Sequence, residues 1–266
     1  MSVTLVDSMG SDLSVVNAAR VSFNKKSMWG HHVPGQGIFE LKKGDIKLIQ
    51  YLAKHGHWTP FGHATLSYHI KAPIFVARQL VKHQVGLVWN EVSRRYVEDE
   101  PEYWEPETWR SKPVDKKQGS GDETILWLNR EERVGAAVSK SCDLAVETYK
   151  RMLDVGVAPE QARMVLPQNT YTEWYWTGSL FAFSRVCNLR CKGDTQEETR
   201  DVAWEIYDYV CDECQHEVLD VFQGRGEDLL YCPECNTPSL RRLIGKSSFI
   251  LKGEGWYAPS KTENDK

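Results

Sequence analysis

The chain contains no apolar run that approaches the ~20 residues of a membrane-spanning helix. Its first residues, MSVTLVDSMG, lack a basic stretch followed by a long apolar one, so we expect no secretory signal. These two absences predict an intracellular, cytoplasmic protein with no membrane partner. An excess of positive charge is also missing, because the formal net charge is −4, and this argues against general attraction to nucleic acid.

Cysteines are few and odd in number, seven in all, which does not fit a disulfide framework. Four of them form two C-x-x-C pairs separated by 17 residues, a spacing typical of a tetrahedral four-thiolate zinc site. These four are Cys211, Cys214, Cys232 and Cys235. A redox dithiol is less favoured, because so short a unit needs metal to fold. We expect the other three, Cys142, Cys187 and Cys191, to be buried thiols.

Hydrophobic residues make up 41% of the 266 residues and charged residues 26%, as in a globular protein with a sizeable core. Apolar periodicity predicts several helices, at 13–23, from 44 to about 56, 74–84, 127–154, from 158, and 195–207. The first should bury Val15, Val16, Ala19 and Phe23. Residues after Thr65 alternate like a strand, and 24–42 read as a loop. Residues 98–124 are either a lid or a plain surface loop.

Polar groups that are costly to bury are concentrated in residues 82–96, KHQVGLVWNEVSRRY, at the end of a predicted helix and in the loop beyond it. Arginine and serine side chains suit a phosphate, while Glu91 and Asn90 suit the edge of a flat heterocycle. Taken singly, the two arginines could be solvated, Glu91 could pair with one of them, and Tyr96 could belong to the core. Their density in one segment favours a ligand site.

Five motifs occur in order over about residues 3–204: HGHWTPFGH, KAPIFVARQ, NEVSRRY, ARMVLPQNTYTEWYWTG and NLR. Together they resemble the flavin-dependent thymidylate synthases, the ThyX family. The resemblance implies an α+β domain of mixed helices and sheet over residues 1–205 and a homotetramer whose subunits share active sites. It also implies reductive methylation of dUMP to dTMP with 5,10-methylenetetrahydrofolate, bound FAD and NADPH.

The same resemblance assigns roles to individual residues. Those expected to bind dUMP are Gln79, Lys82, Glu91, Ser93, Arg94, Arg95, Arg163 and Arg190. Arg190 is also the expected catalytic residue, because a guanidinium beside the uracil would stabilise negative charge on the ring. The family uses no protein nucleophile in its central step, so Ser93 is assigned to binding. Residues expected to contact the flavin are His57, Thr59 (from a neighbouring chain), Lys82, His83, Gln84 and Glu91.

The sequence departs from the family where the flavin should bind. The familiar Arg-His-Arg is Lys82-His83-Gln84 here, with eight residues before the serine where the family has seven. Lysine and glutamine cannot reproduce the bidentate contacts of a guanidinium.

A second departure concerns a later flavin motif. The family's Asn-Ala-Arg appears as Ser179, Leu180 and Phe181, and a usual asparagine is Arg185. We expect Arg185 to lie on one helix with Gly178 and to compensate for the missing guanidiniums, with Ser179 also at the flavin. Two alternatives stay open, a flavin-dependent dUMP hydroxymethylase and a non-catalytic regulator that binds nucleotides or nucleic acid.

Residues 206–260 resemble the small FmdB-type regulatory zinc ribbon, including LRRLI and the terminal KGEGWY. The resemblance implies a separate small domain and a structural zinc ion on the four paired cysteines. Basic residues at 241, 242, 246 and 252 are offset by acidic ones, so nucleic-acid binding by the ribbon is the less favoured alternative.

Overall fold

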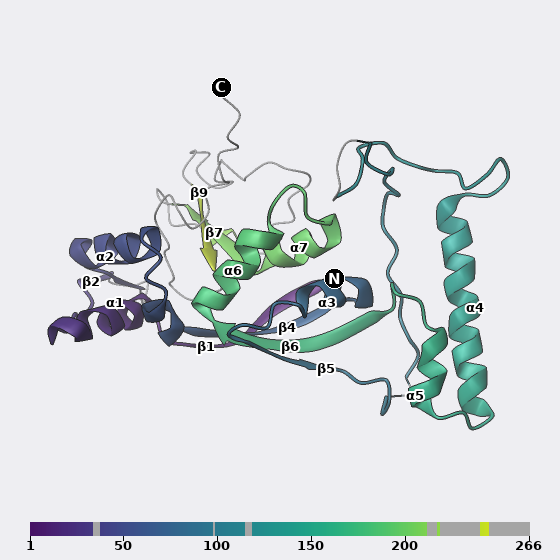
Figure 1. Cartoon of the computed structure of the whole chain (residues 1–266), viewed down its shortest axis with the longest axis horizontal. Helices are drawn as coiled ribbons and strands as arrows, with labels where there is room; N and C mark the ends of the chain where they lie inside the picture. The colour runs from purple at the N-terminus through teal and green to yellow at the C-terminus, as the bar shows by residue number, and fades with distance from the viewer. Residues whose placement is uncertain (34–37, 98, 115–118, 212–216, 219–239, 245–266) are drawn as a thin grey trace.

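The structure is a computed structural model that describes residues 1–33, 38–97, 99–114, 119–211, 217–218 and 240–244. Its centre is a four-stranded sheet in the order β1-β4-β6-β5, in which all neighbours are antiparallel (Figure 1). The strands are β1 (Ser2–Met9), β4 (Thr65–Pro73), β5 (Leu87–Glu91) and β6 (Tyr171–Ser179). The predicted α+β fold is confirmed, and so is the strand after Thr65.

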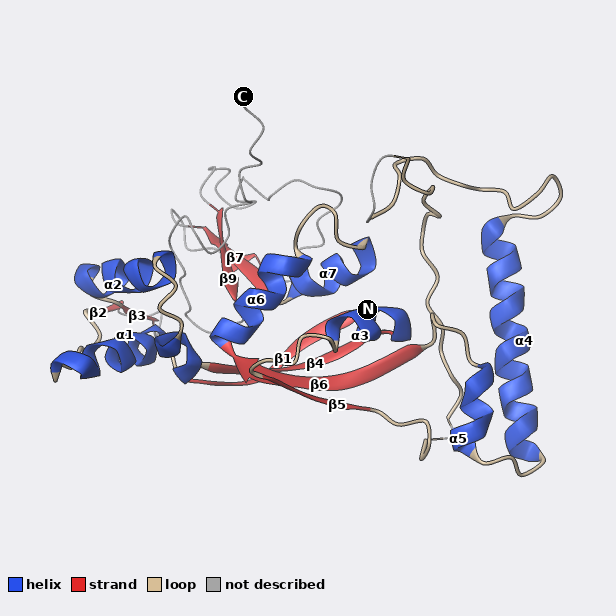
Figure 2. Cartoon of the chain, viewed as in Figure 1, coloured by secondary structure: helices blue, strands red, loops and turns tan. Residues whose placement is uncertain are grey.

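One face of this sheet is apolar and covered by helices. Along β4 the buried positions alternate, with Leu66, Tyr68 and Ile70 pointing to the core, and β6 adds Trp174 and Trp176. The covering helices, seen above the sheet in Figure 2, are α3 (Ile74–Leu80), α6 (Leu180–Arg190) and α7 (Glu197–Glu205). Two of the predicted dUMP residues, Gln79 on α3 and Arg190 on α6, therefore sit on helices packed against the sheet.

A small helical unit lies at one end of the sheet. It consists of α1 (Asp12–Arg20), η1 (Val21–Phe23), β2 (His31–Val33), β3 (Ile38–Glu40), α2 (Lys43–Lys54) and η2 (Thr59–His63). The predicted loop at 24–42 thus contains a short strand pair. Phe23 is 76% exposed, so its expected burial was wrong, because η1 turns the chain away from the buried side of α1.

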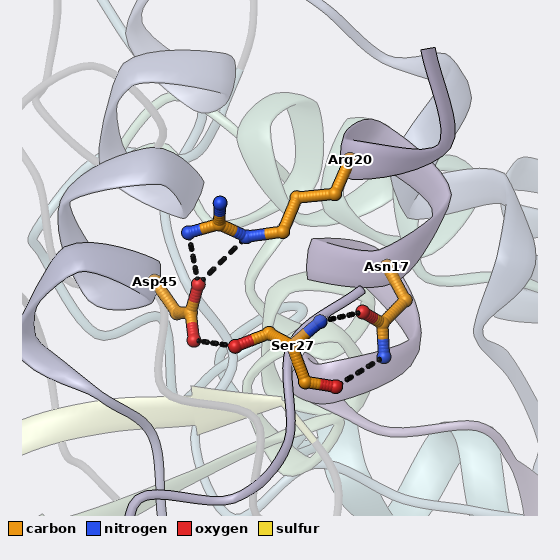
Figure 3. A network of polar contacts seen from close by, with 4 residues as sticks. All are labelled: Asn17, Arg20, Ser27 and Asp45. Atoms are coloured by element: carbon orange, nitrogen blue, oxygen red, sulfur yellow. Dashed lines mark hydrogen bonds and ion pairs between the residues drawn. The ribbon is translucent and has the colours of Figure 1, made fainter. Parts of the chain in front are cut away.

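Figure 3 shows the polar network that ties α1 to α2. Asp45 is fully buried and accepts hydrogen bonds from Arg20 Nε at 2.9 Å and from Ser27 Oγ. Ser27 in turn exchanges backbone hydrogen bonds with the Asn17 side chain, at 2.7 and 3.2 Å. Because a buried carboxylate is tolerated only when it is paired, this network fixes the position of α2 and of the segment that follows it.

A second group of helices lies at the other end of the sheet (Figure 1). It consists of α4 (Val134–Asp154), α5 (Pro159–Ala162) and η3 (Arg163–Val165), which pack on one another. The helix expected from residue 127 begins at Val134, because the chain before it forms a turn closed by a β-bridge between Trp127 and Arg133. Leu144, an apolar residue of α4, is 63% exposed.

The segment 99–133 is neither helix nor strand in its described residues, but part of it is anchored. Arg110 forms ion pairs with Glu197 at 2.9 Å and Glu198 at 2.5 Å, both in the first turn of α7. Tyr103 bridges to Thr170 just before β6. These contacts hold the segment more firmly than a plain surface loop.

The last described strands are β7 (Tyr207–Cys211), β8 (Glu217–Val218) and β9 (Leu240–Ile244), which form a separate sheet in the order β8-β7-β9. Three of the predicted zinc ligands, Cys214, Cys232 and Cys235, lie outside the described residues, and Cys211 is described only as the end of β7. The zinc ribbon therefore stays a prediction. Cys142 and Cys187 are buried as expected, and Cys191 is half-buried.

Among the described residues, no cluster of histidine, cysteine and carboxylate side chains could hold a metal ion. Within the same part of the chain, every helix is too short or too polar to cross a bilayer.

Candidate active site

The predicted catalytic arginine is the last residue of α6 and is held by two contacts. Its Nε donates to Nε2 of His83 over 2.9 Å, and its Nη2 donates to the backbone oxygen of Gln79 over 3.4 Å. His83 follows α3, so the contact joins two helices that lie on the same face of the sheet. We call Gln79, His83, Arg185 and Arg190 the α6 cluster.

The imidazole of His83 is neutral in this arrangement, because its Nε2 accepts a hydrogen bond and so carries no proton. Burial lowers the pKa of His83 and the charges of Arg190 and Arg185 act in the same direction, so that together they bring the pKa from 6.5 to about 4. Burial also lowers the pKa of Arg190, which still leaves a guanidinium charged at neutral pH. A fixed cation of this kind can stabilise charge that develops on a bound ring.

An aromatic surface adjoins the α6 cluster at the start of α6. The rings of Trp58 and Phe181 stack with centroids 5.4 Å apart, and the guanidinium of Arg185 lies over Phe181 at 5.9 Å. His57 and Thr59 flank Trp58 and are exposed. The structure therefore brings these two predicted flavin residues near Arg185, although they are more than 120 positions apart in the sequence.

Gly178 was expected on the same helix as Arg185, and this was wrong. Gly178 lies in β6, where it pairs with Leu66 on one side and Leu87 on the other, and α6 begins only at Leu180. A side chain at Gly178 would collide with the backbone of Gly86, which accounts for the glycine. Ser179 is the N-cap of α6, and its Oγ accepts from Ala182 N at 3.2 Å.

Lys82 and Gln84 are exposed in the turn between α3 and β5. This turn reverses at Gly86, whose φ of +79° favours glycine and which lies against Ala182 of α6. The segment after it was expected to be a loop, but residues 87–91 form the edge strand β5. All five residues of β5 pair with β6 in continuous register, from Leu87 with Gly178 to Glu91 with Trp174.

Glu91 ends β5, and both of its carboxylate oxygens are engaged. Thr172 Oγ1 donates to Oε1 at 2.7 Å, and Trp89 Nε1 donates to Oε2 at 3.1 Å. The Trp89 ring stacks on Trp174 with centroids 4.4 Å apart, which holds this edge of the sheet. Glu91 therefore presents a fixed carboxylate at the end of the edge strand.

The remaining predicted phosphate residues lie in the loop after β5 and in η3. Arg95 Nε donates to Ser93 Oγ at 3.2 Å, and Arg94 Nη1 donates to the Asp99 backbone oxygen at 2.8 Å. Arg163 is exposed, with its Nε directed to the Glu160 backbone oxygen at 3.3 Å. Tyr96, which could have been core, is 77% exposed. We call Ser93, Arg94, Arg95 and Arg163 the arginine-rich group.

The α6 cluster and the arginine-rich group belong to different parts of the chain. Arg163 opens η3, which packs with α5 on α4 at one end of the sheet, whereas α6 lies over the sheet itself (Figure 1). The segment after Arg95 also runs to α4, where the Val97 backbone oxygen accepts from Tyr149 at 3.5 Å. The sequence predicted that the catalytic and the phosphate-binding residues act in one site. Within a single chain, the structure places them on separate units.

Two residues of the site were missed by sequence reasoning. Gln196, just before α7, accepts a hydrogen bond from the Gln79 side chain. Nothing in the charged segment around it marks this contact. Trp58 forms the aromatic surface, and a signal existed, because it stands between His57 and Thr59 in the motif HGHWTP.

Known proteins are similar to this chain over most of its length. Residues 4–214 match the family described as thymidylate synthase complementing protein. The flavin-dependent thymidylate synthase of Thermosipho africanus is 38% identical over 213 residues, which cover 79% of this chain and 86% of that protein. The enzyme of the same name from Treponema denticola is 31% identical over 254 residues, 95% of this chain and 90% of that protein.

A solved structure is similar as well. The UMP/dUMP methylase PolB from Streptomyces cacaoi, bound with 5-Br dUMP, is 31% identical and superposes with a TM-score of 0.60, over 76% of this chain and 86% of that chain. Family, relatives and fold agree with the resemblance that the five ordered motifs indicated. The chain belongs to the flavin-dependent thymidylate synthases.

Proposed function

We propose that the chain methylates dUMP to dTMP, with 5,10-methylenetetrahydrofolate as carbon donor and NADPH as reductant of bound FAD. The observation that carries the proposal is the Arg190 guanidinium, which a neutral His83 and the Gln79 backbone hold in one place. Arg190 would polarise the uracil, because a preorganised cation stabilises the negative charge that develops on the ring. Glu91, already fixed by two donors, would hold the other edge of the base.

The residues at the start of α6 fit a flavin. Its ring system needs an aromatic or apolar surface, and its carbonyl oxygens need donors; Trp58 with Phe181 supplies the first and Arg185 the second. The same region would be lined by His57, Lys82, His83, Gln84 and Ser179, and Thr59 would come from a neighbouring chain. When bound, the flavin supplies hydride, and the protein orients it and excludes water. His83 cannot act as an acid near pH 7, because it is neutral.

The arginine-rich group would bind the phosphate of dUMP, for which exposed guanidiniums and a serine hydroxyl are suited. Because this group and the α6 cluster lie on separate units, we infer that a second copy of the chain completes each active site. A symmetric oligomer places the same two surfaces against each other repeatedly. This supports the homotetramer with shared sites.

The test is incubation of the purified chain with dUMP, methylenetetrahydrofolate, FAD and NADPH, followed by mass spectrometry of the nucleotide. We expect dTMP, and we expect it to vanish with Arg190→Ala. A product one oxygen heavier would indicate hydroxymethylation instead, and unchanged dUMP would contradict both. A parallel reaction with UMP is informative, because the solved relative is described as a UMP/dUMP methylase.

We also propose that residues 206–260 form a zinc ribbon on Cys211, Cys214, Cys232 and Cys235. The spacing of the two pairs supports it. The Treponema denticola enzyme aligns over 95% of this chain, so the alignment extends past residue 214 into this segment. Elemental analysis of the full chain should find about one zinc ion per chain, lost when Cys232 and Cys235 are both changed to serine. A gel shift at low salt would show whether the ribbon binds nucleic acid.

A further inference from the structure

The turn between α6 and α7, residues 191–196, contains no residue that was expected to bind substrate or cofactor. It ends at Gln196, a half-buried residue in the N-cap position of α7. The Gln196 side chain accepts a hydrogen bond from the side chain of Gln79, which lies on α3. The helices α3 and α7 contact each other above the sheet (Figure 2). The hydrogen bond therefore connects an unassigned turn to one of the residues expected to bind dUMP.

The backbone that carries Gln196 is held on both sides. Thr199 N donates to the Gln196 backbone oxygen at 3.1 Å, within the first turn of α7. The buried Arg200 donates from Nη1 to the Gly193 backbone oxygen at 3.3 Å, which ties the turn to the helix. Arg110 forms ion pairs with the two glutamates that follow Gln196. The Gln196 side chain therefore extends from a backbone that several contacts fix.

Gln79 is held at its backbone by one residue and at its side chain by another. Its backbone oxygen accepts from Arg190 Nη2 at 3.4 Å, and its side-chain amide donates to Gln196. A glutamine side chain without such a contact samples several rotamers, and ordering it when a ligand binds costs conformational entropy. The contact with Gln196 orders the Gln79 side chain before any ligand arrives, so a ligand that needs this side chain binds more tightly.

We propose that Gln196 is a positioning residue of the substrate site, which holds the Gln79 side chain in the conformation that binds dUMP. The inference rests on the proposed function and on the expected role of Gln79 in it. Gln196 acts on dUMP only through Gln79. Its contribution to dUMP affinity must therefore disappear when the Gln79 amide is removed, whereas a general effect of the turn on the fold would remain.

The test is a double-mutant cycle on dUMP binding to the full chain loaded with FAD, measured by calorimetry. Methionine is the replacement at both positions, because it has about the length of glutamine and no amide. Gln196→Met should raise the dUMP dissociation constant about fivefold, as loss of one ordering hydrogen bond does. In the Gln79→Met background the same change should matter less than about twofold. In turnover, the loss in Gln196→Met should appear mainly in the KM for dUMP and not in kcat.

Thr195→Val is the matched control within the same turn. Thr195 precedes Gln196, and its Oγ1 donates to the Leu189 backbone oxygen of α6 at 3.2 Å. The change removes a side-chain contact of the turn without removing the hydrogen bond to Gln79. Its dUMP affinity should lie within about twofold of the parent. Thermal unfolding of every variant shows that dUMP is offered to folded protein.

The outcomes distinguish this inference from the function on which it rests. A loss in Gln196→Met that disappears in the Gln79→Met background supports the positioning role. The same loss in both backgrounds, or an equal loss in Thr195→Val, would overturn it. If Gln79→Met weakens dUMP binding and Gln196→Met does not, the positioning role fails and the substrate site stands. If Gln79→Met binds dUMP as the parent does, the expected role of Gln79 fails and the inference fails with it.

Discussion

Arg190 Nε donates a hydrogen bond to His83 Nε2 over 2.9 Å. This contact fixes the protonation state of His83 and the direction of the Arg190 guanidinium. His83 must be unprotonated at Nε2 to accept, so a histidine that sequence alone would allow as an acid is a neutral support for a cation. Burial and the two arginines act in the same direction on its pKa. The pair is therefore most stable where His83 is neutral.

This relationship predicts how stability depends on pH. The unfolded chain protonates His83 near 6.5, whereas the folded chain protonates it only near 4, so the unfolded state binds more protons between these values. The contribution of His83 to the free energy of unfolding should thus be complete above pH 6.5 and should decline as pH falls toward 4. Urea unfolding at pH 7.0, 5.5 and 4.5 measures it.

The matched control for that experiment is His83→Gln, which keeps an acceptor but cannot titrate. The variant should lose less stability than the parent between pH 7.0 and 4.5. Asp201 affects the free energy of unfolding in the opposite direction, because its pKa is about 6 in the folded chain and 3.8 in a model peptide. The stability that it contributes is therefore lost as pH rises through 6. Identical pH profiles for parent and His83→Gln would contradict the assignment.

Removing the guanidinium at Arg185 should weaken FAD binding. The Arg185 guanidinium lies over the ring of Phe181, which belongs to the aromatic surface at the start of α6. We expect Arg185→Ala to raise the FAD dissociation constant by about tenfold, the equivalent of one charge-assisted contact. Titration of flavin fluorescence with the apoprotein measures the constant.

Arg151→Ala serves as the control, since Arg151 is an exposed residue of α4, away from this surface. Its FAD affinity should equal that of the parent. If Arg185→Ala also binds FAD as the parent does, then Arg185 does not replace the guanidiniums missing at Lys82 and Gln84.

Subunit mixing tests whether two copies build one active site. Arg163→Ala removes a residue of the arginine-rich group and Arg190→Ala a residue of the α6 cluster, so each variant alone should be nearly inactive at low dUMP concentration. If each site takes one group from each of two copies, co-expression of the two variants should restore about a quarter of the parent activity, because random pairing leaves that share of sites intact.

The contrary outcome is equally clear. If both groups came from one chain, every site in the mixture would carry a defect and activity would stay at the level of the single variants. Native mass spectrometry of the same samples reports whether mixed oligomers formed, so a failure to exchange subunits is distinguished from a site within one chain.

The network in Figure 3 predicts a large effect on stability far from the arginine-rich group. Asp45→Asn leaves the Arg20 guanidinium without its carboxylate in a partly buried place, and loss of one partner of such a pair costs about 3 kcal/mol. Urea unfolding measures the change. Glu100→Gln breaks the exposed pair with Lys150 and should cost less than about 1 kcal/mol. Equal costs for the two variants would contradict this account of Asp45.

Sequence reasoning recovered the elements whose pattern is local. The strand after Thr65 alternates strictly because one of its faces is buried, and the helix at 44–54 repeats its apolar residues with the helical period. Sequence reasoning missed β1 and β6, and it placed Gly178 on a helix. In β6 the exposed side carries aromatic Tyr171 and Tyr175, so the difference between the two faces that marks a strand is weak.

The sequence by itself determined the family and the α+β class and supplied the candidate site residues, because ordered motifs preserve side-chain chemistry and spacing along the chain. Only the tertiary structure decided which of those residues meet: His83 with Arg190, Gln79 with Gln196, and Trp58 with Phe181. These contacts join positions that are about a hundred residues apart. Such pairs are selected by the packing of α3, α6 and η2 against the sheet, which depends on the whole core and leaves no periodic signal in any one segment.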